Sequence, residues 1–362
     1  MNLTPDAFPE DNLRNLIVEA LARHTKIPKT RIISQPNREK YWNPENPLDA
    51  TPELDEVFYL MRALNARALR NSSIAADEMG RLNFSVAIAR FATDIADAIH
   101  DRPFTYVEMG PEPIKTTCLI RCLRAHGVRL TGYIGIDINP ASEKPMREAL
   151  ASEIEPSMTH FCFRDFANLA STDVHTEDFP SLITMLGFQD GNEHPYTIAR
   201  RLKKIVLPGD LVASEMHVGT KSTFDKIQEF YESPEMKRFS RLAFERIIGM
   251  LPSEYCIHTL DIDAGFASPV PVCVTSESFE DPDTGTTSLC ATNWCLKLSP
   301  LQHRYTREAG TNMQIIAERR TGDRTISFQL AEAAAYDRAL VRTYEPLATT
   351  LPENTNQMEK SQ

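Results

Sequence analysis

Acidic residues follow three short apolar runs in the middle of the chain. Glu108 and Gly110 come at the end of the first run, Asp137 ends the second, and Asp165-Phe166 follows the third. Because parallel strands bind ligands outside their carboxyl ends, we expect these side chains to lie together. A glycine lets a ligand approach the backbone, one acid can accept hydrogen bonds from both ribose hydroxyls, and an acid beside an aromatic ring suits an adenine. The pattern predicts a nucleoside site.

Each of these acids has a simpler interpretation when it is taken alone. An acid at the end of a strand often only caps the next helix or forms a turn. Three acids in register at consecutive strands favour a ligand site. The loop after Glu108 contains Pro111 and Pro113 and lacks a GxGxxG pattern. A nucleoside without phosphates therefore fits this loop better than a dinucleotide does.

A glutamate and a histidine alternate in the segment Ser214-Glu215-Met216-His217. Strand alternation places Glu215 and His217 on one face. A carboxylate there can hold a cationic nitrogen, and a histidine can accept the departing proton. We therefore assign both residues to catalysis and Glu215 also to substrate binding. A surface ion pair at the end of a strand is the alternative.

Alternating apolar runs and helical patterns after residue 103 predict an α/β fold with a parallel sheet. The expected strands are Phe104–Met109, Gly132–Ile138, Thr159–Phe163, Leu182–Gly187 and Leu211–Glu215. The expected helices are Lys115–His126, Ala141–Ile154 and Tyr196–Val206. The turn Pro208-Gly209-Asp210 leads into the fifth strand.

The parts of the chain on either side of this region have a different pattern of apolar residues. Apolar residues at helical spacing predict helices at 11–24, 52–70 and 82–100, whereas the chain beyond residue 250 is rich in strand patterns. We therefore divide the chain into an N-terminal helical lid domain, a Rossmann-like nucleoside-binding domain, a β-rich C-terminal extension on the substrate side and a disordered tail, at 1–100, 101–250, 251–350 and 351–362.

The long polar segment Pro28–Pro47 is expected to act as a lid, because it carries the aromatic pair Tyr41-Trp42 between two predicted helices. Tyr41 is a candidate substrate contact. Tyr231 and Glu232 are further candidates for the pocket, whereas Phe230 is expected to pack in a helical core.

The order of Glu108-x-Gly110, Asp137, Asp165-Phe166 and the Pro-Gly-Asp turn resembles that of class I S-adenosylmethionine-dependent methyltransferases. The resemblance implies a Rossmann-like methyltransferase sheet and S-adenosyl-L-methionine as the cofactor. It covers about residues 104–310 in scattered segments.

A narrower resemblance concerns Lys115-Thr116, then Leu186-Gly187 and Gly191-Asn192, together with Leu207–Leu211 and Tyr305–Glu308. These segments are similar to the family of the histidine-specific N-methyltransferase of ergothioneine biosynthesis. The resemblance adds Lys115 and Gly187 to the cofactor site and implies that Asn192 holds the substrate's amino-acid group. A simple turn at Gly191-Asn192 is the alternative.

Two departures from that family bear on the substrate. The positions at which the family grips the imidazole hold Pro300 and Gln302, and its tyrosine-rich N-terminal motif has no match in residues 50–75. We therefore expect N-methylation of a free amino acid or related small amine, with an arginine-like guanidino substrate favoured over histidine, in specialised biosynthesis. The alternatives are a histidine or other α-amino N-methyltransferase, a nucleotide-dependent oxidoreductase, and a non-catalytic nucleoside-binding module.

Composition limits the partners. Acidic residues exceed basic ones by 50 − 39 = 11 in 362 residues, which disfavours nucleic-acid binding. No apolar run reaches the roughly 18 residues of a membrane span, and residues 1–10 lack the features of a secretion signal. We expect a cytoplasmic protein with a small-molecule substrate and seven reduced cysteines. Oligomerisation stays open, and the histidine and cysteine spacings predict no metal site.

Overall fold

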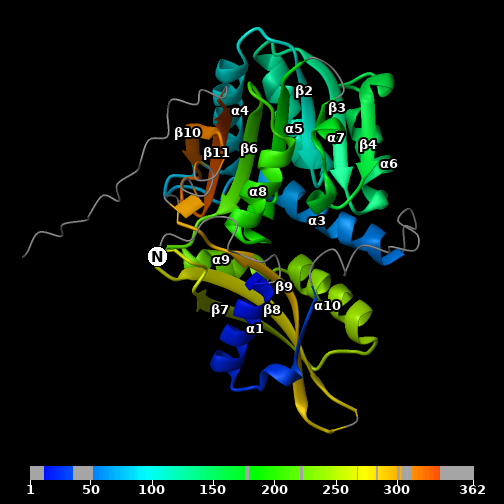
Figure 1. Ribbon diagram of the computed structural model, residues 1–362, viewed down its shortest axis with the longest axis vertical. Coiled ribbons are helices and arrows are strands. Elements are labelled where there is room, and N and C mark those ends of the chain that lie inside the picture. The colour runs from blue at the N-terminus through cyan, green and yellow to red at the C-terminus, as the bar shows by residue number, and fades with distance from the viewer. Residues whose placement is uncertain are drawn as a thin grey trace, which may run out of the picture.

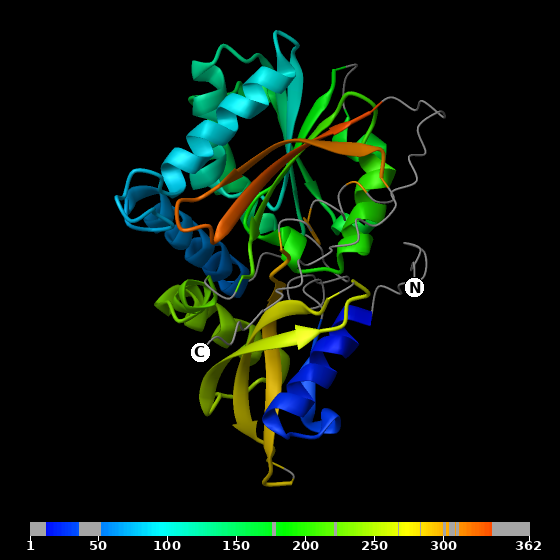
Figure 2. The ribbon, with the colours of Figure 1, turned by 90° about the vertical axis from the view of Figure 1, so that its left-hand side faces the viewer.

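The protein is an α/β structure with two separate sheets (Figure 1). The computed structural model describes residues 12–35, 52–175, 179–220, 223–266, 268–282, 284–299, 302, 303, 308 and 311–334. Figure 2 shows the larger sheet above the smaller one.

The larger sheet has seven strands, in the order β10-β11-β6-β5-β2-β3-β4. All neighbours are parallel except β11, which is antiparallel to both β6 and β10. Since β2 pairs with β3 on one side and with β5 on the other, the strand order reverses between β2 and β5. Ligands bind to such sheets at that point, outside the carboxyl ends of the strands. The strands are β2 (Phe104–Met109), β3 (Leu130–Asp137), β4 (Thr159–Phe163), β5 (Ser181–Met185), β6 (Leu211–His217), β10 (Met313–Arg320) and β11 (Ile326–Ala333).

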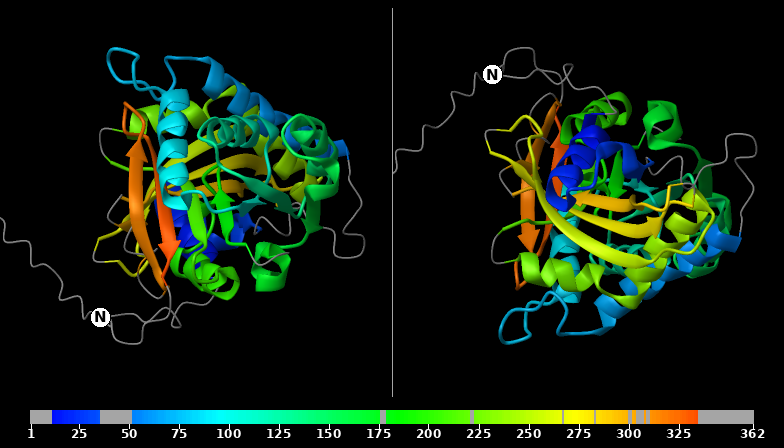
Figure 3. Two further views of the ribbon diagram at one scale, coloured as in Figure 1. Left: turned by 90° about the horizontal axis from the view of Figure 1, so that it is seen from above. Right: turned by 90° about the horizontal axis from the view of Figure 1, so that it is seen from below.

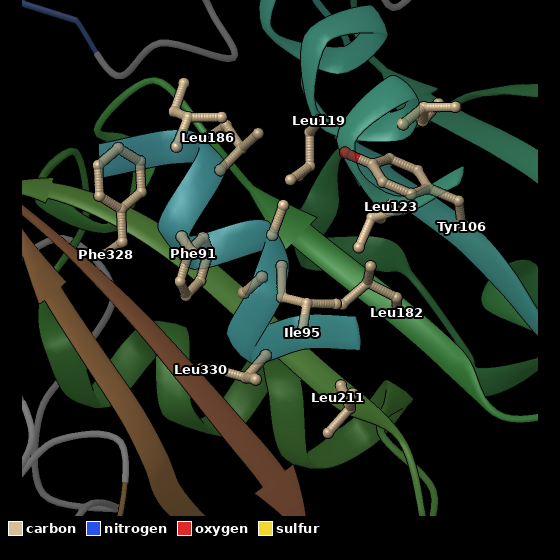
Figure 4. Close-up of a cluster of buried hydrophobic side chains, with 14 of the residues drawn as sticks. Phe91, Ile95, Tyr106, Leu119, Leu123, Leu182, Leu186, Leu211, Phe328 and Leu330 are labelled. Carbon is tan, nitrogen blue, oxygen red and sulfur yellow. The ribbon is translucent and has the colours of Figure 1, made fainter. Parts of the chain in front are cut away.

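Helices cover both faces of this sheet. Alternation along β2 turns Tyr106 toward α4 and α5 and Val107 toward α8, so each face has its own buried core. Figure 4 shows the first core, where Phe91 of α4 packs on Phe328 of β11 with 5.3 Å between ring centroids. The helices are α4 (Phe84–Ile99), α5 (Pro113–Ala125), α6 (Glu143–Leu150), α7 (Ser171–Val174) and α8 (Pro195–Ile205). Short 3₁₀ turns are η3 (Pro140–Ser142), η4 (Pro156–Met158), η5 (Phe166–Asn168) and η6 (Gln189–Gly191).

The smaller sheet has the order β1-β9-β8-β7. Its core holds Leu13, Ile17 and Leu21 of α1 against the apolar side chains of β8 and β9 (Figure 3). On α10, Phe244 packs on Phe279 of β8. The elements are α1 (Asn12–Thr25), η2 (Lys29–Arg31), β1 (Ile32–Ser34), α9 (Phe224–Tyr231), α10 (Pro234–Ile248), β7 (Glu254–Ile262), β8 (Val270–Glu280) and β9 (Thr287–Leu296).

The helix α3 (Pro52–Arg70) connects the two halves. Its Arg67 pairs with Glu235 of α10 at 3.0 Å, and its Glu56 pairs with Arg238 of α10 at 2.6 Å. On the other side, Asn139 Nδ2 donates to the Leu54 carbonyl at 3.1 Å. The helix is therefore tied both to the small sheet's helix and to the loop after β3.

The five predicted parallel strands are confirmed within two residues at each end. The predicted domain boundaries, in contrast, do not follow the sheets. Residues 12–34 pack with β7, β8 and β9, and β10 and β11 leave the predicted C-terminal extension to pair in the larger sheet. Strand patterns reveal which face is buried but not which edge a strand joins, so β11 could not be assigned to β6 from sequence.

Part of the predicted lid is strand: Ile32–Ser34 pairs in parallel with β9 at Leu289–Ala291. Tyr41, Trp42 and the tail 351–362 lie outside the described residues. None of the seven cysteines forms a disulfide in the structure, and Cys273, Cys290 and Cys295 are buried. In the described part of the chain, no helix combines the length and apolar character needed to cross a membrane, and no three His, Cys, Asp or Glu residues form a metal-binding group.

The hairpin between β10 and β11 depends on Gly322. Its N–H donates to the Leu82 carbonyl at 2.9 Å, and a Cβ there would collide with the Leu82 carbonyl oxygen and the Asp77 amide nitrogen. We expect Gly322→Ala to lower the free energy of unfolding by about 1–3 kcal/mol, because main-chain atoms must move. Urea denaturation measures this. Gly132→Ala is the control, since its Cβ meets only ordinary contacts from 3.4 Å outward; equal losses in both variants contradict the prediction.

Candidate functional site

A cavity of about 1000 Å³ opens at the carboxyl edge of the seven-stranded sheet and extends toward α3, α9 and α10. This volume lies at the upper end for small-molecule sites. All seven predicted cofactor residues line it: Glu108, Gly110, Lys115, Asp137, Asp165, Phe166 and Gly187. The structure thus brings together side chains from four strand ends, at the reversal of strand order.

Glu108 is the most buried of these acids, at 1% exposure. Its carboxyl group accepts hydrogen bonds from Thr116 Oγ1 at 2.6 Å and Tyr133 OH at 2.9 Å. Burial raises the pKa of Glu108 to about 8, although the two hydroxyl groups oppose this rise. Glu108 is therefore mostly protonated at neutral pH.

The loop after β2 turns at Gly110, whose φ is +73°. A Cβ at Gly110 would collide with the side-chain amide of Gln189. Gln189 lines the same cavity, and its buried Oε1 has no hydrogen-bond partner among the described residues. Sequence analysis missed Gln189, since glutamine in a loop carries no distinctive signal.

The sequence allowed two interpretations of Asp137 and Asp165, as turn formers or as ligand-site residues, and the structure is consistent with both. Asp137 Oδ1 accepts from the Asn139 N–H, and Asp165 Oδ1 accepts from the Ala167 N–H, each at 2.9 Å. Both form turns in this way and still line the cavity beside Phe166. Because an ionised carboxylate has about four acceptor positions, a turn bond leaves capacity for a ligand. Burial raises the pKa of Asp137 to about 6.

Glu215 forms an ion pair, but a buried one. Its Oε2 lies 2.7 Å from Lys115 Nζ and accepts from the Gly187 N–H at 3.0 Å. The two charged side chains are 1% and 3% exposed. Glu215 Oε1 is buried and has no hydrogen-bond partner in the described part of the protein. The alternative of a surface ion pair is therefore wrong, and the charge of Glu215 is already matched by Lys115.

His217 lies on the same face of β6 and lines the cavity. Its ring stacks on Phe188 with 3.7 Å between centroids, and its Nδ1 lies 3.0 Å from Lys297 Nζ. Burial, together with the charges of Lys297 and Lys115, holds the pKa of His217 well below its ordinary value. An ammonium group beside Nδ1 favours that nitrogen as an acceptor. This geometry argues against His217 as the acceptor of a substrate proton.

Only some of the predicted substrate-binding residues line the cavity. Asn192 and Glu232 line the cavity, whereas Tyr231 is buried behind its wall and accepts a hydrogen bond from Lys297 Nζ at 2.8 Å. Phe230, expected to pack in a helical core, is partly buried against such a core and also lines the cavity. The angular position of these neighbours on α9 is set by packing against the small sheet, which the sequence pattern alone left undetermined.

Apolar side chains also line the cavity. Met61, Leu64, Phe188, Phe230 and Phe239 contribute from α3, from the loop after β5 and from α9 and α10. Aromatic rings next to a polar floor suit a ligand with an apolar body and a few polar groups.

No protein-family model matches this chain, and no curated protein sequence is similar to it. Among solved structures, the chain is similar to the CcbJ methyltransferase from Streptomyces caelestis, with 10% identity, a TM-score of 0.39 and coverage of 73% of this chain and 100% of that one. The chain is also similar to a putative Zn-dependent alcohol dehydrogenase from Rhodobacter sphaeroides, with 12% identity and a TM-score of 0.39. This similarity covers 79% of this chain and 100% of that one.

A third similar structure is a Burkholderia thailandensis 1,6-didemethyltoxoflavin-N1-methyltransferase with bound S-adenosylhomocysteine, at 11% identity and a TM-score of 0.38. It matches 76% of this chain and 88% of that one. These distant similarities include methyltransferases as well as a dehydrogenase. The functional argument therefore comes from the residues of this chain.

The raised pKa of Glu108 predicts a pH-dependent stability. The folded protein keeps a proton on Glu108 that the unfolded chain releases above its ordinary pKa of 4.5. This contribution is complete below pH 4.5 and is lost as the pH rises through about 8. We expect Glu108→Gln to show a shallower fall in the free energy of unfolding over this range than the wild type. Urea titrations at several pH values measure it, and parallel pH profiles contradict it.

Proposed function

We propose that this chain is an S-adenosylmethionine-dependent methyltransferase that methylates a nitrogen of a small molecule. One observation carries the proposal: a nucleoside-type set of acids and a buried carboxylate with a free oxygen line the same cavity. Asp137 ends β3, Asp165 and Phe166 follow β4, and Glu215 Oε1 belongs to β6, which β5 and β2 separate from β3.

The residues present fit the cofactor. Asp137 at the end of β3 would hold the ribose, and Asp165 with Phe166 would hold the adenine. Gly110 lets the side-chain amide of Gln189 approach its backbone closely, and this amide lines the cavity. When bound, the cofactor supplies an already activated methyl group, so the protein mainly aligns the reactants.

The start of α5 argues against the oxidoreductase alternative. A dinucleotide places its pyrophosphate on the free N–H groups of this helix terminus. Here the Glu112 side chain accepts from the N–H groups of Ile114 and Lys115, each at 2.9 Å. The chain's own carboxylate thus fills the position that a phosphate needs, and its charge repels one.

The non-catalytic alternative accounts less well for the rest of the cavity. A binding module for a nucleoside needs neither the additional space toward α3 and α10 nor a buried ion pair at the end of β6. Burying Lys115 and Glu215 costs desolvation energy, which catalytic sites commonly bear in order to hold a charge in place.

We propose an amine nitrogen as the methyl acceptor, with its N–H donating to Glu215 Oε1. As the nitrogen gains the methyl group, Glu215 accepts the proton that it sheds. The ion pair with Lys115 holds the Glu215 carboxylate in place. The Asn192 amide lines the cavity and supplies a donor and an acceptor for an amino-acid group. Because Lys115 already balances the charge of Glu215, a guanidinium loses the preference that the sequence indicated.

Cofactor binding is tested through Asp137. We expect Asp137→Ala to weaken binding of S-adenosylhomocysteine about 10- to 150-fold in calorimetry, because a charge-assisted acceptor is lost. In the wild type, affinity should fall as the pH drops below about 6, where Asp137 takes up a proton. Asp261→Ala, at an exposed position of β7, is the control. Unchanged affinity in Asp137→Ala, or tight binding of NADH, argues against the proposal.

Turnover is tested through Glu215. In a mass-spectrometric panel of amines and amino acids, we expect Glu215→Gln to reduce turnover at least about 100-fold, or roughly 2.7 kcal/mol of transition-state stabilisation. Affinity for S-adenosylhomocysteine should change little. Glu254→Gln removes an exposed carboxylate of β7 that does not line the cavity and should keep its activity. Near wild-type turnover in Glu215→Gln excludes the assigned role.

A further inference from the structure

A lysine without a carboxylate partner lies behind the cavity wall. Lys297 follows β9 directly and is 0% exposed. Its Nζ donates to His217 Nδ1 at 3.0 Å and to Tyr231 Oη at 2.8 Å. No ion pair to Lys297 is found within the described residues. A fully buried ammonium costs desolvation energy, which neutral acceptors offset only in part.

Backbone contact brings Lys297 to this place. Gly219 follows β6, and a Cβ there would lie 2.5 Å from the carbonyl oxygen of Lys297. The loop after β6 and the end of β9 therefore meet main chain to main chain. The lysine and His217 are held together by this approach of the two sheets.

The opposite edge of the His217 ring belongs to the cavity. His217 lines the cavity, whereas Lys297 and Tyr231 do not. Phe188 covers one ring face at 3.7 Å, and Phe230 meets the ring edge to face at 5.2 Å. Nδ1 is used by the lysine, and Nε2 has no hydrogen-bond partner in the described part of the chain. The ring is thus held with its N–H available for a ligand.

We propose that Lys297 is a positioning residue that fixes His217 as the Nε2–H tautomer, so that His217 donates a hydrogen bond to a negatively charged oxygen of the methyl acceptor. This proposal rests on the proposed function and specifies its substrate: the molecule carries an anionic oxygen, such as a carboxylate, besides its nucleophilic nitrogen.

The positive charge of Lys297 favours an anion next to the His217 ring. Lys115 and Glu215 form their own ion pair, so next to His217 the charge of Lys297 is the one without an ion-pair partner among the described residues. Its field reaches the ligand through the polarised imidazole, at low effective dielectric. Glu215 and His217 are two residues apart on β6, about 7 Å along the strand. An acceptor with nitrogen and anionic oxygen several ångströms apart can meet both groups.

The tautomer is tested by ¹⁵N NMR on the full chain with S-adenosylhomocysteine added, with His217 assigned from the signal missing in His217→Phe. We expect a protonated Nε2 and an unprotonated Nδ1 in the wild type. Acetate serves as the anionic probe and acetamide as its neutral match. Acetate should shift the Nε2–H resonance much more than acetamide does. A protonated Nδ1, or equal shifts from the two probes, overturns the proposal.

Variants of the lysine connect the tautomer to the substrate. In Lys297→Met we expect loss of the acetate response and, for any amino acid that is methylated, a KM at least about tenfold higher, the value of one charge-assisted hydrogen bond. Lys297→Arg should restore part of the acetate response and bring the KM part of the way back to the wild-type value. Preference for amino acids over their carboxamides should disappear in Lys297→Met. If Lys297→Met does not fold, the wild-type tautomer and the comparison of acetate with acetamide decide the proposal by themselves.

These outcomes separate the two proposals. Absence of cofactor binding and methylation contradicts the proposed function and leaves the wild-type tautomer measurement valid. Methylation that persists in Lys297→Met with unchanged KM and unchanged acid-over-amide preference contradicts only the role of Lys297.

Discussion

The structure depends on the close approach of the end of β9 to the loops that leave β5 and β6. Gly191 and Gly219 make this approach geometrically available, because a Cβ at either one would collide with the main chain of β9 or of the residue after it. The Trp294 indole N–H adds a hydrogen bond to the Asn192 carbonyl at 3.0 Å. Two sheets that are far apart in the chain are thereby held around one cavity, and Lys297 is carried to His217.

Charge is distributed in this cavity so that the chain satisfies most of its own ionic groups. Glu108 holds a proton at neutral pH, Glu215 is matched by Lys115, and Glu112 occupies the start of α5. Each arrangement limits what can bind: the cap on α5 disfavours phosphates, and the matched Glu215 removes the pull on a guanidinium. Directional acceptors and donors at single atoms remain, which suits a ligand recognised by hydrogen bonds.

Several features of the site could be predicted because they depend on local order. The strand ends followed from apolar runs and turn residues, and the acids at those ends had to meet at one edge of a parallel sheet. Asp137, Asp165 and Gly110 therefore line the cavity as expected. Tyr231 was misplaced because a one-residue step on a helix turns a side chain by about 100°, and only packing sets that angle.

The sequence by itself determined the strands, their parallel order and the acids at their ends, since hydrophobic periodicity and chain direction act over a few residues. Only the tertiary structure decided the partners of the buried charges. Lys115 meets Glu215 from 100 residues away, and Lys297 meets His217 from 80. Such contacts depend on how sheets and helices pack, and periodicity carries no information about distant partners. The tertiary structure therefore placed Glu215 beside a lysine that matches its charge and His217 beside a second, buried lysine.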